Sequence, residues 1–199
     1  SAQGHFDSPL AAIVASINRN LALRGISNRF VTSFFGILCP DGSCRYVNAG
    51  HNPPLLLRRD GSMEQLTAGG MVLGLFPGEE YRSACARFGP GDRLVLFTDG
   101  IVEAQDRAGN EFGLDCLVSV LRAHARLQVP EMLAAAQAAV LAFSEGVAQL
   151  DDITMLILEF RGGADKEEPC QIGNRTFPVR AGDGNERGVG SATGNRTPV

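Results

Sequence analysis

Residues 92–98, Asp-Arg-Leu-Val-Leu-Phe-Thr, form a short run that is apolar at nearly every central position. The run follows Gly89-Pro90-Gly91 and leads directly into Asp99-Gly100. Apolar residues that do not alternate with polar ones are typical of a central strand whose two faces are both covered. A chain of 199 residues, 44% of them hydrophobic, can bury a core of that kind within one domain.

Six other short segments are rich in β-branched or aromatic residues, or alternate between apolar and polar ones, and predict further strands. They are residues 30–38, 44–48, 55–58, 63–66, 81–88 and 153–160. Asp41-Gly42 separates the first two segments and Asp60-Gly61 separates the next two. Because Asp-Gly is a pair that hairpin turns use, the sequence predicts two β-hairpins.

Three segments place apolar residues at helical spacing, namely residues 8–24, 114–127 and 130–143. Ser8 is a suitable N-cap and Pro9 a suitable first helical residue, while Pro130 opens an alanine-rich segment. The order of one helix, several strands, two helices and a last strand predicts an antiparallel α+β fold with helices against sheet faces.

Charge and composition limit the kinds of molecule that this chain is expected to bind. The formal net charge of -4 provides no basic stripe, so binding to nucleic acid or to an anionic membrane has no electrostatic support. No apolar run reaches the roughly 18 residues of a spanning helix, and no signal peptide opens the chain, so a cytoplasmic location is expected. Residues 161–199 are rich in glycine, asparagine and charged residues without periodicity, which predicts a disordered tail.

Asp99 is the first residue with a candidate chemical role, because it directly follows the apolar run. A carboxylate at the end of a buried strand is costly to desolvate unless a cation meets it, and a hard divalent metal ion is the usual one. Gly100 after it would permit a sharp turn. The alternative is that Asp99 only caps that turn, since Asp-Gly is common in turns.

Asp151 and Asp152 precede the last predicted strand. Their mutual repulsion is unfavourable, and a bound cation can offset it. Successive side chains of a strand point to opposite faces, so only one of the two can readily face the same site as Asp99. The alternative is a solvated turn.

His51 lies in the segment Asn48-Ala49-Gly50-His51-Asn52-Pro53-Pro54, where two prolines stiffen the loop. An imidazole close to a phosphate can act as a general acid toward the leaving group or can hydrogen-bond to a metal-bound water. The alternative is a histidine that only braces its own loop.

Taken together and in order, five segments resemble those of the sporulation-stage-II-E and sigma-regulatory phosphatases. These form a bacterial branch of the PP2C-like (PPM-type), metal-dependent protein serine/threonine phosphatases. The segments are residues 29–32 (Arg-Phe-Val-Thr), 48–53, 73–75 (Leu-Gly-Leu), 97–104 (Phe-Thr-Asp-Gly-Ile-Val-Glu-Ala) and 151–154 (Asp-Asp-Ile-Thr). The resemblance covers residues 8–160, so residues 1–160 are interpreted as a partial phosphatase domain.

The resemblance implies an antiparallel β-sandwich flanked by helices, with two Mn²⁺ or Mg²⁺ ions at one end. Water that bridges the two ions attacks phosphoserine or phosphothreonine, so no catalytic side chain is expected beyond the metal-bound water. Asp99 and Asp151 resemble metal ligands of the family. Supporting residues by the same resemblance are Asn48, His51, Gly100, Glu103 and Asp152, with His51 as a brace and Asp152 as the weaker ligand candidate.

One departure from the family pattern concerns the start of the chain. Family members carry a Gly-Asp-Val-Ser-Gly-His-Gly-like motif, whose aspartate bridges both metals, ahead of the helix that starts here near Ser8. Residues 1–7, Ser-Ala-Gln-Gly-His-Phe-Asp, do not match it. We therefore expect a fold that lacks its first strands and first helix, with an open edge, and weak metal binding and hydrolysis by this chain alone.

The leading functional hypothesis is that the chain dephosphorylates a regulatory protein. The resemblance implies that this protein is an anti-sigma-factor antagonist. The enzyme could act as a homodimer. A second hypothesis is a non-catalytic interaction module that keeps the fold, and a third is a purely structural β-rich domain. Metal dependence separates the first hypothesis from the other two. Partner binding without metal dependence separates the second from the third.

Overall fold

The computed structural model describes residues 9–24, 29–149, 151–162, 171–172 and 175–176. The chain divides into two compact units, Ser1–Glu168 and Pro169–Val199. In the second unit, β9 (Gln171–Ile172) pairs antiparallel with β10 (Arg175–Thr176). These two short strands stand inside the predicted tail, where the sequence shows no strand pattern. The rest of residues 163–199 lies outside the described residues, and the tail stays a prediction.

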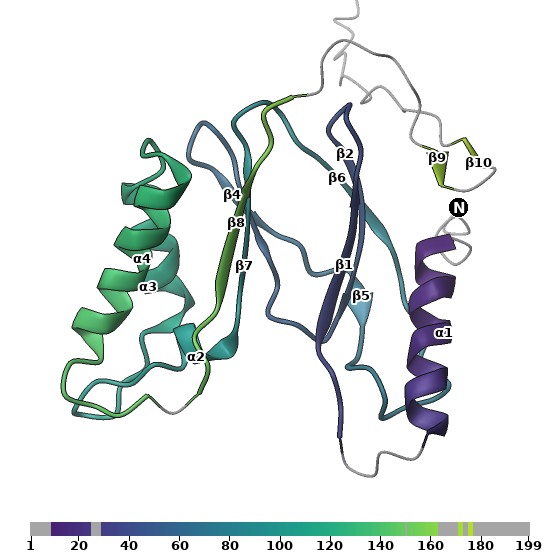
Figure 1. Cartoon of the computed structure of the whole chain (residues 1–199), viewed down its shortest axis with the longest axis horizontal. Coiled ribbons are helices and arrows are strands. Elements are labelled where there is room, and N and C mark those ends of the chain that lie inside the picture. Colours follow the sequence, from purple (N-terminus) through teal and green to yellow (C-terminus); the bar gives the residue numbers. More distant parts are fainter. Residues whose placement is uncertain (1–8, 25–28, 150, 163–170, 173–174, 177–199) are drawn as a thin grey trace, which may run out of the picture. The chain divides into compact units, whose positions relative to one another are not determined.

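The first unit contains two facing sheets (Figure 1). The first sheet consists of β1 (Ser33–Leu38), β2 (Ser43–Ala49), β5 (Gly69–Gly70) and β6 (Ala84–Arg87), with β2 paired to the other three. The second sheet has the order β4 (Met63–Gln65), β3 (Leu55–Leu57), β7 (Arg93–Phe97) and β8 (Met155–Glu159). Among the described strands of this unit, β2 and β5 form a parallel pair and the other pairs are antiparallel.

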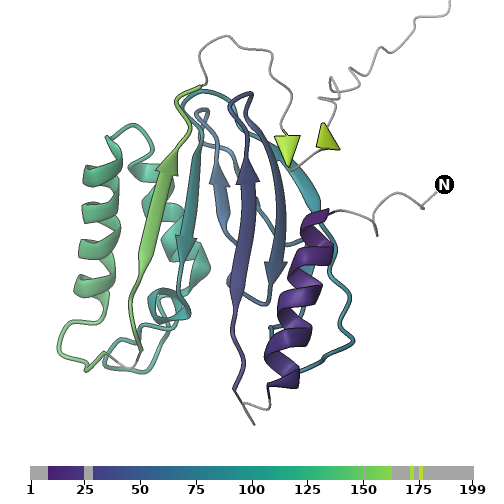
Figure 2. The same ribbon diagram turned by 45° about the vertical axis from the view of Figure 1, so that its right-hand side comes forward.

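Helices cover the outer face of each sheet, as both views show (Figures 1 and 2). Helix α1 (Pro9–Leu23) packs against the first sheet, and α3 (Gly113–Ala123) and α4 (Val129–Phe143) pack against the second. A short helix, α2 (Asp99–Val102), follows β7. The result is the α+β sandwich flanked by helices that the sequence predicts.

Strand β7 shows why its sequence has no polar alternation. Leu94 and Leu96 lie in the cluster of side chains between the two sheets. Val95 and Phe97 belong to the cluster between the second sheet and helices α2, α3 and α4. Both faces of β7 are therefore covered, and β3 and β8 flank it, which confirms the prediction of a central strand.

The predicted hairpins are also present. β1 pairs with β2 from Ser33↔Ala49 to Leu38↔Cys44, and β3 pairs with β4 around the turn at Asp60-Gly61. In the first turn, Asp41 accepts hydrogen bonds from the Ser43 hydroxyl (2.7 Å) and the Ser43 main-chain N–H (2.9 Å). These two bonds hold the pKa of Asp41 below its ordinary value and stabilise the turn.

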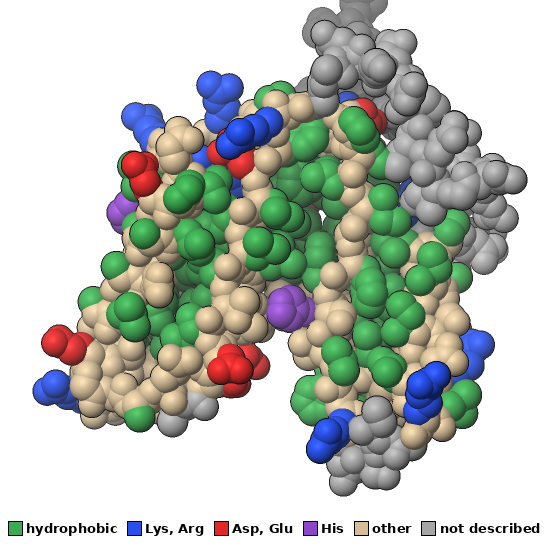
Figure 3. Space-filling model, in the orientation of Figure 1, with side chains coloured by type: hydrophobic (Ala, Val, Ile, Leu, Met, Phe, Trp, Pro, Cys, Tyr) green, Lys and Arg blue, Asp and Glu red, His purple; other side chains and the backbone are tan. Residues whose placement is uncertain are grey.

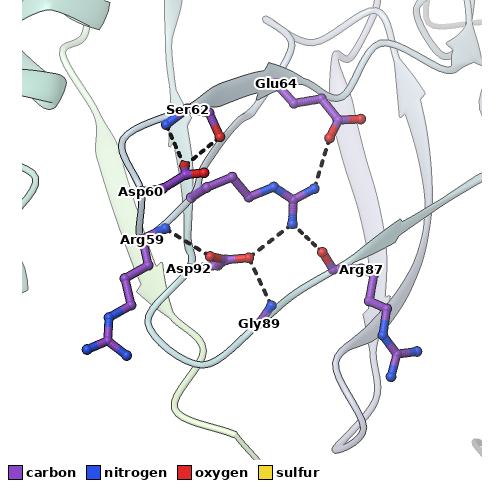
Figure 4. Close-up of polar contacts among 8 residues, drawn as sticks. Arg59, Asp60, Ser62, Glu64, Arg87, Gly89 and Asp92 are labelled. Atoms are coloured by element: carbon purple, nitrogen blue, oxygen red, sulfur yellow. Dashed lines mark hydrogen bonds and ion pairs between the residues drawn. The ribbon is translucent and has the colours of Figure 1, made fainter. Parts of the chain in front are cut away.

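A partly buried ion pair, between the buried Asp92 and the 30% exposed Arg58 side chain, forms the centre of a cluster that links the two sheets at the start of β7 (Figure 4). Asp92 accepts hydrogen bonds from Arg58 Nη1 (3.0 Å), the Arg59 main-chain N–H (3.0 Å) and the Gly89 main-chain N–H (2.9 Å). Arg58 follows a strand of the second sheet, and its guanidinium also donates to the main-chain carbonyl of Arg87 in the first sheet. This cluster lies at the end of β7 away from Asp99.

The sandwich has apolar side chains at an uncovered edge. Within the described residues, β8 pairs only with β7, and its Leu156 and Leu158 are 50% and 47% exposed. Their register partners, Leu96 and Leu94, lie in the cluster between the sheets, so all four side chains share one face. Figure 3 shows apolar side chains along this side of the molecule. Apolar side chains are therefore exposed along the β8 edge of the second sheet.

The described residues include four helices, the longest of which have 15 residues. None of them is both long enough and apolar enough to cross a membrane.

Candidate metal centre

Asp99 and Asp151 lie at the same end of the second sheet. Asp99 follows β7 after one residue, and Asp151 precedes β8 by a short connection. Because these two strands pair antiparallel, with Phe97 opposite Met155, the end of one meets the start of the other. The pairing of β7 and β8 therefore brings together two aspartate-bearing segments that are about fifty residues apart in the sequence.

Thr98 fixes the two segments against each other. Its main-chain N–H donates to the Thr154 carbonyl (3.0 Å), and its hydroxyl donates to the Asp152 carbonyl (2.7 Å). The same hydroxyl accepts a hydrogen bond from the Thr154 main-chain N–H (2.9 Å). Thr98 was not among the predicted site residues, although its position directly before Asp99 in the sequence could have indicated this role.

Gly100 is required by the close packing around it. Asp99 begins helix α2, and Gly100 is not among the glycines with positive φ, so no left-handed turn requires it. There is no space for a side chain at this position, because a Cβ atom here would lie 2.6 Å from the Asp152 carbonyl oxygen and 3.2 Å from the Asp151 carbonyl carbon. The close approach of two backbones therefore explains the glycine, without a positive φ.

Both candidate ligands present carboxylates to solvent. Asp99 Oδ1 accepts a hydrogen bond from the Gly100 main-chain N–H (3.1 Å), and Asp151 Oδ1 accepts one from the Asp152 main-chain N–H (2.7 Å). Neither carboxylate forms an ion pair within the described residues. Oxygen ligands of this kind suit Mn²⁺ or Mg²⁺. Asp152 is also exposed at this turn, and its carbonyl is the group that Thr98 holds.

These carboxylates supply part of a ligand set. Across the described residues, no group of three or more His, Cys, Asp or Glu side chains comes together in a way that could hold a metal ion. The donor chemistry of Asp99 and Asp151 therefore fits a hard divalent ion, and further oxygen ligands are needed to complete its coordination.

Asn48 and His51 form a closed turn at the end of β2. The buried Asn48 side chain donates from Nδ2 to the His51 carbonyl (2.9 Å) and accepts from the His51 main-chain N–H at Oδ1 (2.8 Å). The Nδ1 atom of the His51 ring lies 3.3 Å from the Thr32 hydroxyl oxygen. These contacts are those of residues that brace a loop, and within the described residues His51 does not join the two aspartates in a ligand cluster.

Glu103 lies just after α2, and its main-chain N–H donates to the Asp99 carbonyl (2.8 Å). Its side chain is exposed and lines a cavity of about 420 Å³, whose wall also includes Gly100 and Asp151. No local sequence pattern predicts this cavity, because its lining comes from three separate segments of the chain.

The sequence of this chain is similar to that of a known protein family over most of its length. The family described as stage II sporulation protein E (SpoIIE) matches residues 2–161. Protein IcfG of Synechocystis sp. is 30% identical over 128 residues, which are 64% of this chain and 20% of IcfG. The phosphoserine phosphatase RsbU of Bacillus subtilis is 28% identical over 99 residues, which are 49% of this chain and 30% of RsbU.

A solved structure shows the same fold. The SiaA-PP2C domain of Pseudomonas aeruginosa superimposes with a TM-score of 0.56 at 20% identity, over 76% of this chain and 69% of that domain. At this identity the likeness concerns the fold. The chain spans less than a third of the curated relatives IcfG and RsbU.

Proposed function

The chain belongs to the stage II sporulation protein E family, which matches residues 2–161, and we propose that it is a metal-dependent protein phosphatase. Its substrate would be phosphoserine or phosphothreonine on a regulatory protein. The observation that carries the proposal is the meeting of Asp99 and Asp151 where β7 ends and β8 begins. RsbU, a relative of this chain, is named a phosphoserine phosphatase, which supports the class of reaction.

Asp99 and Asp151 are the residues that would hold Mn²⁺ or Mg²⁺. Such an ion, when bound, supplies an activated water and stabilises negative charge on phosphoryl oxygens. Thr98 holds the two aspartate segments together through its hydroxyl, and Gly100 allows their backbones to approach. Asn48 and His51 brace the loop that enters β3, so the chain's own residues position ligands and no side-chain nucleophile is invoked.

We further propose that this chain alone hydrolyses phosphate esters weakly. The described residues offer Asp99 and Asp151 on adjacent segments and no cluster of three ligands, which is a sparse set for two divalent ions. The regulatory partner is proposed to be an anti-sigma-factor antagonist in the cytoplasm. A non-catalytic interaction module with the same fold is the second candidate, and the exposed apolar edge at Leu156 and Leu158 favours it.

Phosphate release from a phosphoserine protein, with and without Mn²⁺, tests the function. We expect a low rate that requires Mn²⁺ and falls at least about tenfold in Asp99→Asn and in Asp151→Asn, because each change removes a charged oxygen ligand. Asp115→Asn, at an exposed position of α3, is the matched control and should keep the rate.

Three outcomes separate the candidates. Turnover that depends on Mn²⁺ and on both aspartates supports the phosphatase. Turnover that survives both substitutions would show that the site is elsewhere. No turnover, combined with metal-independent binding of the phosphoprotein, would favour the interaction module.

A further inference from the structure

The cavity of about 420 Å³ beside the candidate metal centre has no part in the proposed hydrolysis. Gly100 and Asp151 form one wall, so it opens next to the two aspartates. The other walls come from the loop of residues 103–111, the end of α4 and the connection that leads to β8. A protein substrate with its phosphoserine at Asp99 and Asp151 would place neighbouring residues close to this cavity.

The lining combines carboxylates with apolar side chains. Glu103, Glu111 and Glu145 line the cavity and are exposed, and within the described residues their carboxylates have no hydrogen bond or ion pair. Leu141 and Val147 supply apolar surface. No lysine, arginine or histidine is part of the lining.

A nearby cation does not neutralise the cavity. Arg107 donates from Nε to the main-chain carbonyl of Glu145 (3.2 Å), and its guanidinium packs against Gly146. It forms no ion pair with a carboxylate of the described residues, and it does not line the cavity. The Glu145 carbonyl therefore accepts a hydrogen bond from Arg107, while the three glutamate carboxylates that line the cavity have no partner among the described residues.

The spacing of the carboxylates indicates the kind of cation. Within the described part of the chain they do not converge as three ligands on one point, so a bare metal ion is a poor match. A long basic side chain fits better, because its aliphatic stem can pack on Leu141 and Val147 while its charged end reaches carboxylates. A volume of about 420 Å³ leaves room for such a side chain and for adjoining backbone.

We propose that this cavity binds an arginine or lysine side chain close to the phosphoserine of the substrate, so that the enzyme prefers phosphorylated sites flanked by a basic residue. The proposal rests on the proposed phosphatase function and adds its substrate specificity. Attraction between the basic residue and Glu103, Glu111 and Glu145 would strengthen binding without changing the chemistry at the metal ions.

A peptide series tests the preference with the full chain. Each peptide carries one phosphoserine in an alanine background, with a single arginine moved from three residues before it to three residues after it. Binding of fluorescent peptides is measured by anisotropy in Mn²⁺, and phosphate release is measured in parallel. The variants are Glu111→Gln and Glu145→Gln, singly and together, and Glu80→Gln, an exposed residue outside this cavity, is the control.

We expect an arginine in at least one position to raise affinity roughly threefold to tenfold over alanine. The double variant should reduce that ratio to about one, Glu80→Gln should preserve it, and hydrolysis of p-nitrophenyl phosphate should be unchanged in all variants. Equal affinity for every peptide, or a preference that persists in the double variant, overturns the inference.

The two measurements distinguish this inference from the proposed function. Preferential binding that the double variant abolishes, without Mn²⁺-dependent phosphate release, would support the cavity and contradict the phosphatase. Mn²⁺-dependent release that ignores the arginine would support the phosphatase and contradict the role of the cavity.

Discussion

Single residues decide how closely the two aspartate segments approach, and Gly100 is the clearest case. A methyl group in Gly100→Ala would lie 2.6 Å from the Asp152 carbonyl oxygen, so the Asp151–Asp152 turn must move away from Asp99. Overpacking against backbone costs about 1–3 kcal/mol. We therefore expect a lower free energy of unfolding, measured by urea titration, together with weaker Mn²⁺ binding measured by calorimetry.

Gly78→Ala provides the matched control, because nothing lies within 4 Å of the position its Cβ would occupy and its φ is not positive. It should unfold at the same urea concentration as the unsubstituted chain. If Gly100→Ala behaved like Gly78→Ala, the close approach of Gly100 to Asp152 would have no energetic importance.

Between elements, Arg93 of β7 ties the connection that follows α3 to the second sheet. Its buried guanidinium pairs with Glu159 (2.9 Å) and donates to the main-chain carbonyls of Ala125 (3.1 Å) and Leu127 (2.7 Å). Arg93→Met keeps much of the volume but leaves these acceptors without their donor. We expect a loss of about 3 kcal/mol in the free energy of unfolding.

Arg161→Met is the control for Arg93→Met, since Arg161 also approaches Glu159 (3.5 Å) but its side chain is 82% exposed. An exposed pair contributes at most about 1 kcal/mol, so urea unfolding of this variant should change little. Equal losses in the two variants would contradict a special role for the buried guanidinium.

At the scale of the whole first unit, Asp92 holds the Arg58 side chain that links the two sheets. Its carboxylate receives three hydrogen bonds, from Arg58, Arg59 and Gly89, with both oxygens in use. In Asp92→Asn one of the two oxygens becomes an amide group, which cannot accept, so at least one donor loses its partner. We expect a loss of about 1–3 kcal/mol in unfolding free energy by urea titration.

Glu64→Gln tests the same ion-pair cluster at its exposed rim. Glu64 contacts only the other nitrogen of Arg58 (3.0 Å), with its side chain 55% exposed, so this variant should lose well under about 1 kcal/mol. A larger loss for Glu64→Gln than for Asp92→Asn would show that the exposed pair, rather than the buried one, holds the sheets.

Most elements could be predicted from the sequence, because their signals are local. Apolar spacing predicted α1, α3 and α4, and Asp-Gly pairs predicted both hairpins. The unbroken apolar run predicted the central strand β7. The short helix α2 and the strand β5 were not predicted, since elements of a few residues depend on their neighbours more than on their own composition.

The construction of the candidate site depends on contacts between distant segments, which only the folded chain makes. Asp99 and Asp151 were proposed as ligands through the family resemblance, but their meeting follows from the register of β7 with β8, a long-range pairing that no local pattern encodes. The same pairing explains Gly100, whose role is to leave space for Asp152, and Thr98, which bonds across the two segments. The cavity lined by Glu103, Glu111 and Glu145 likewise exists only because folding brings distant segments together.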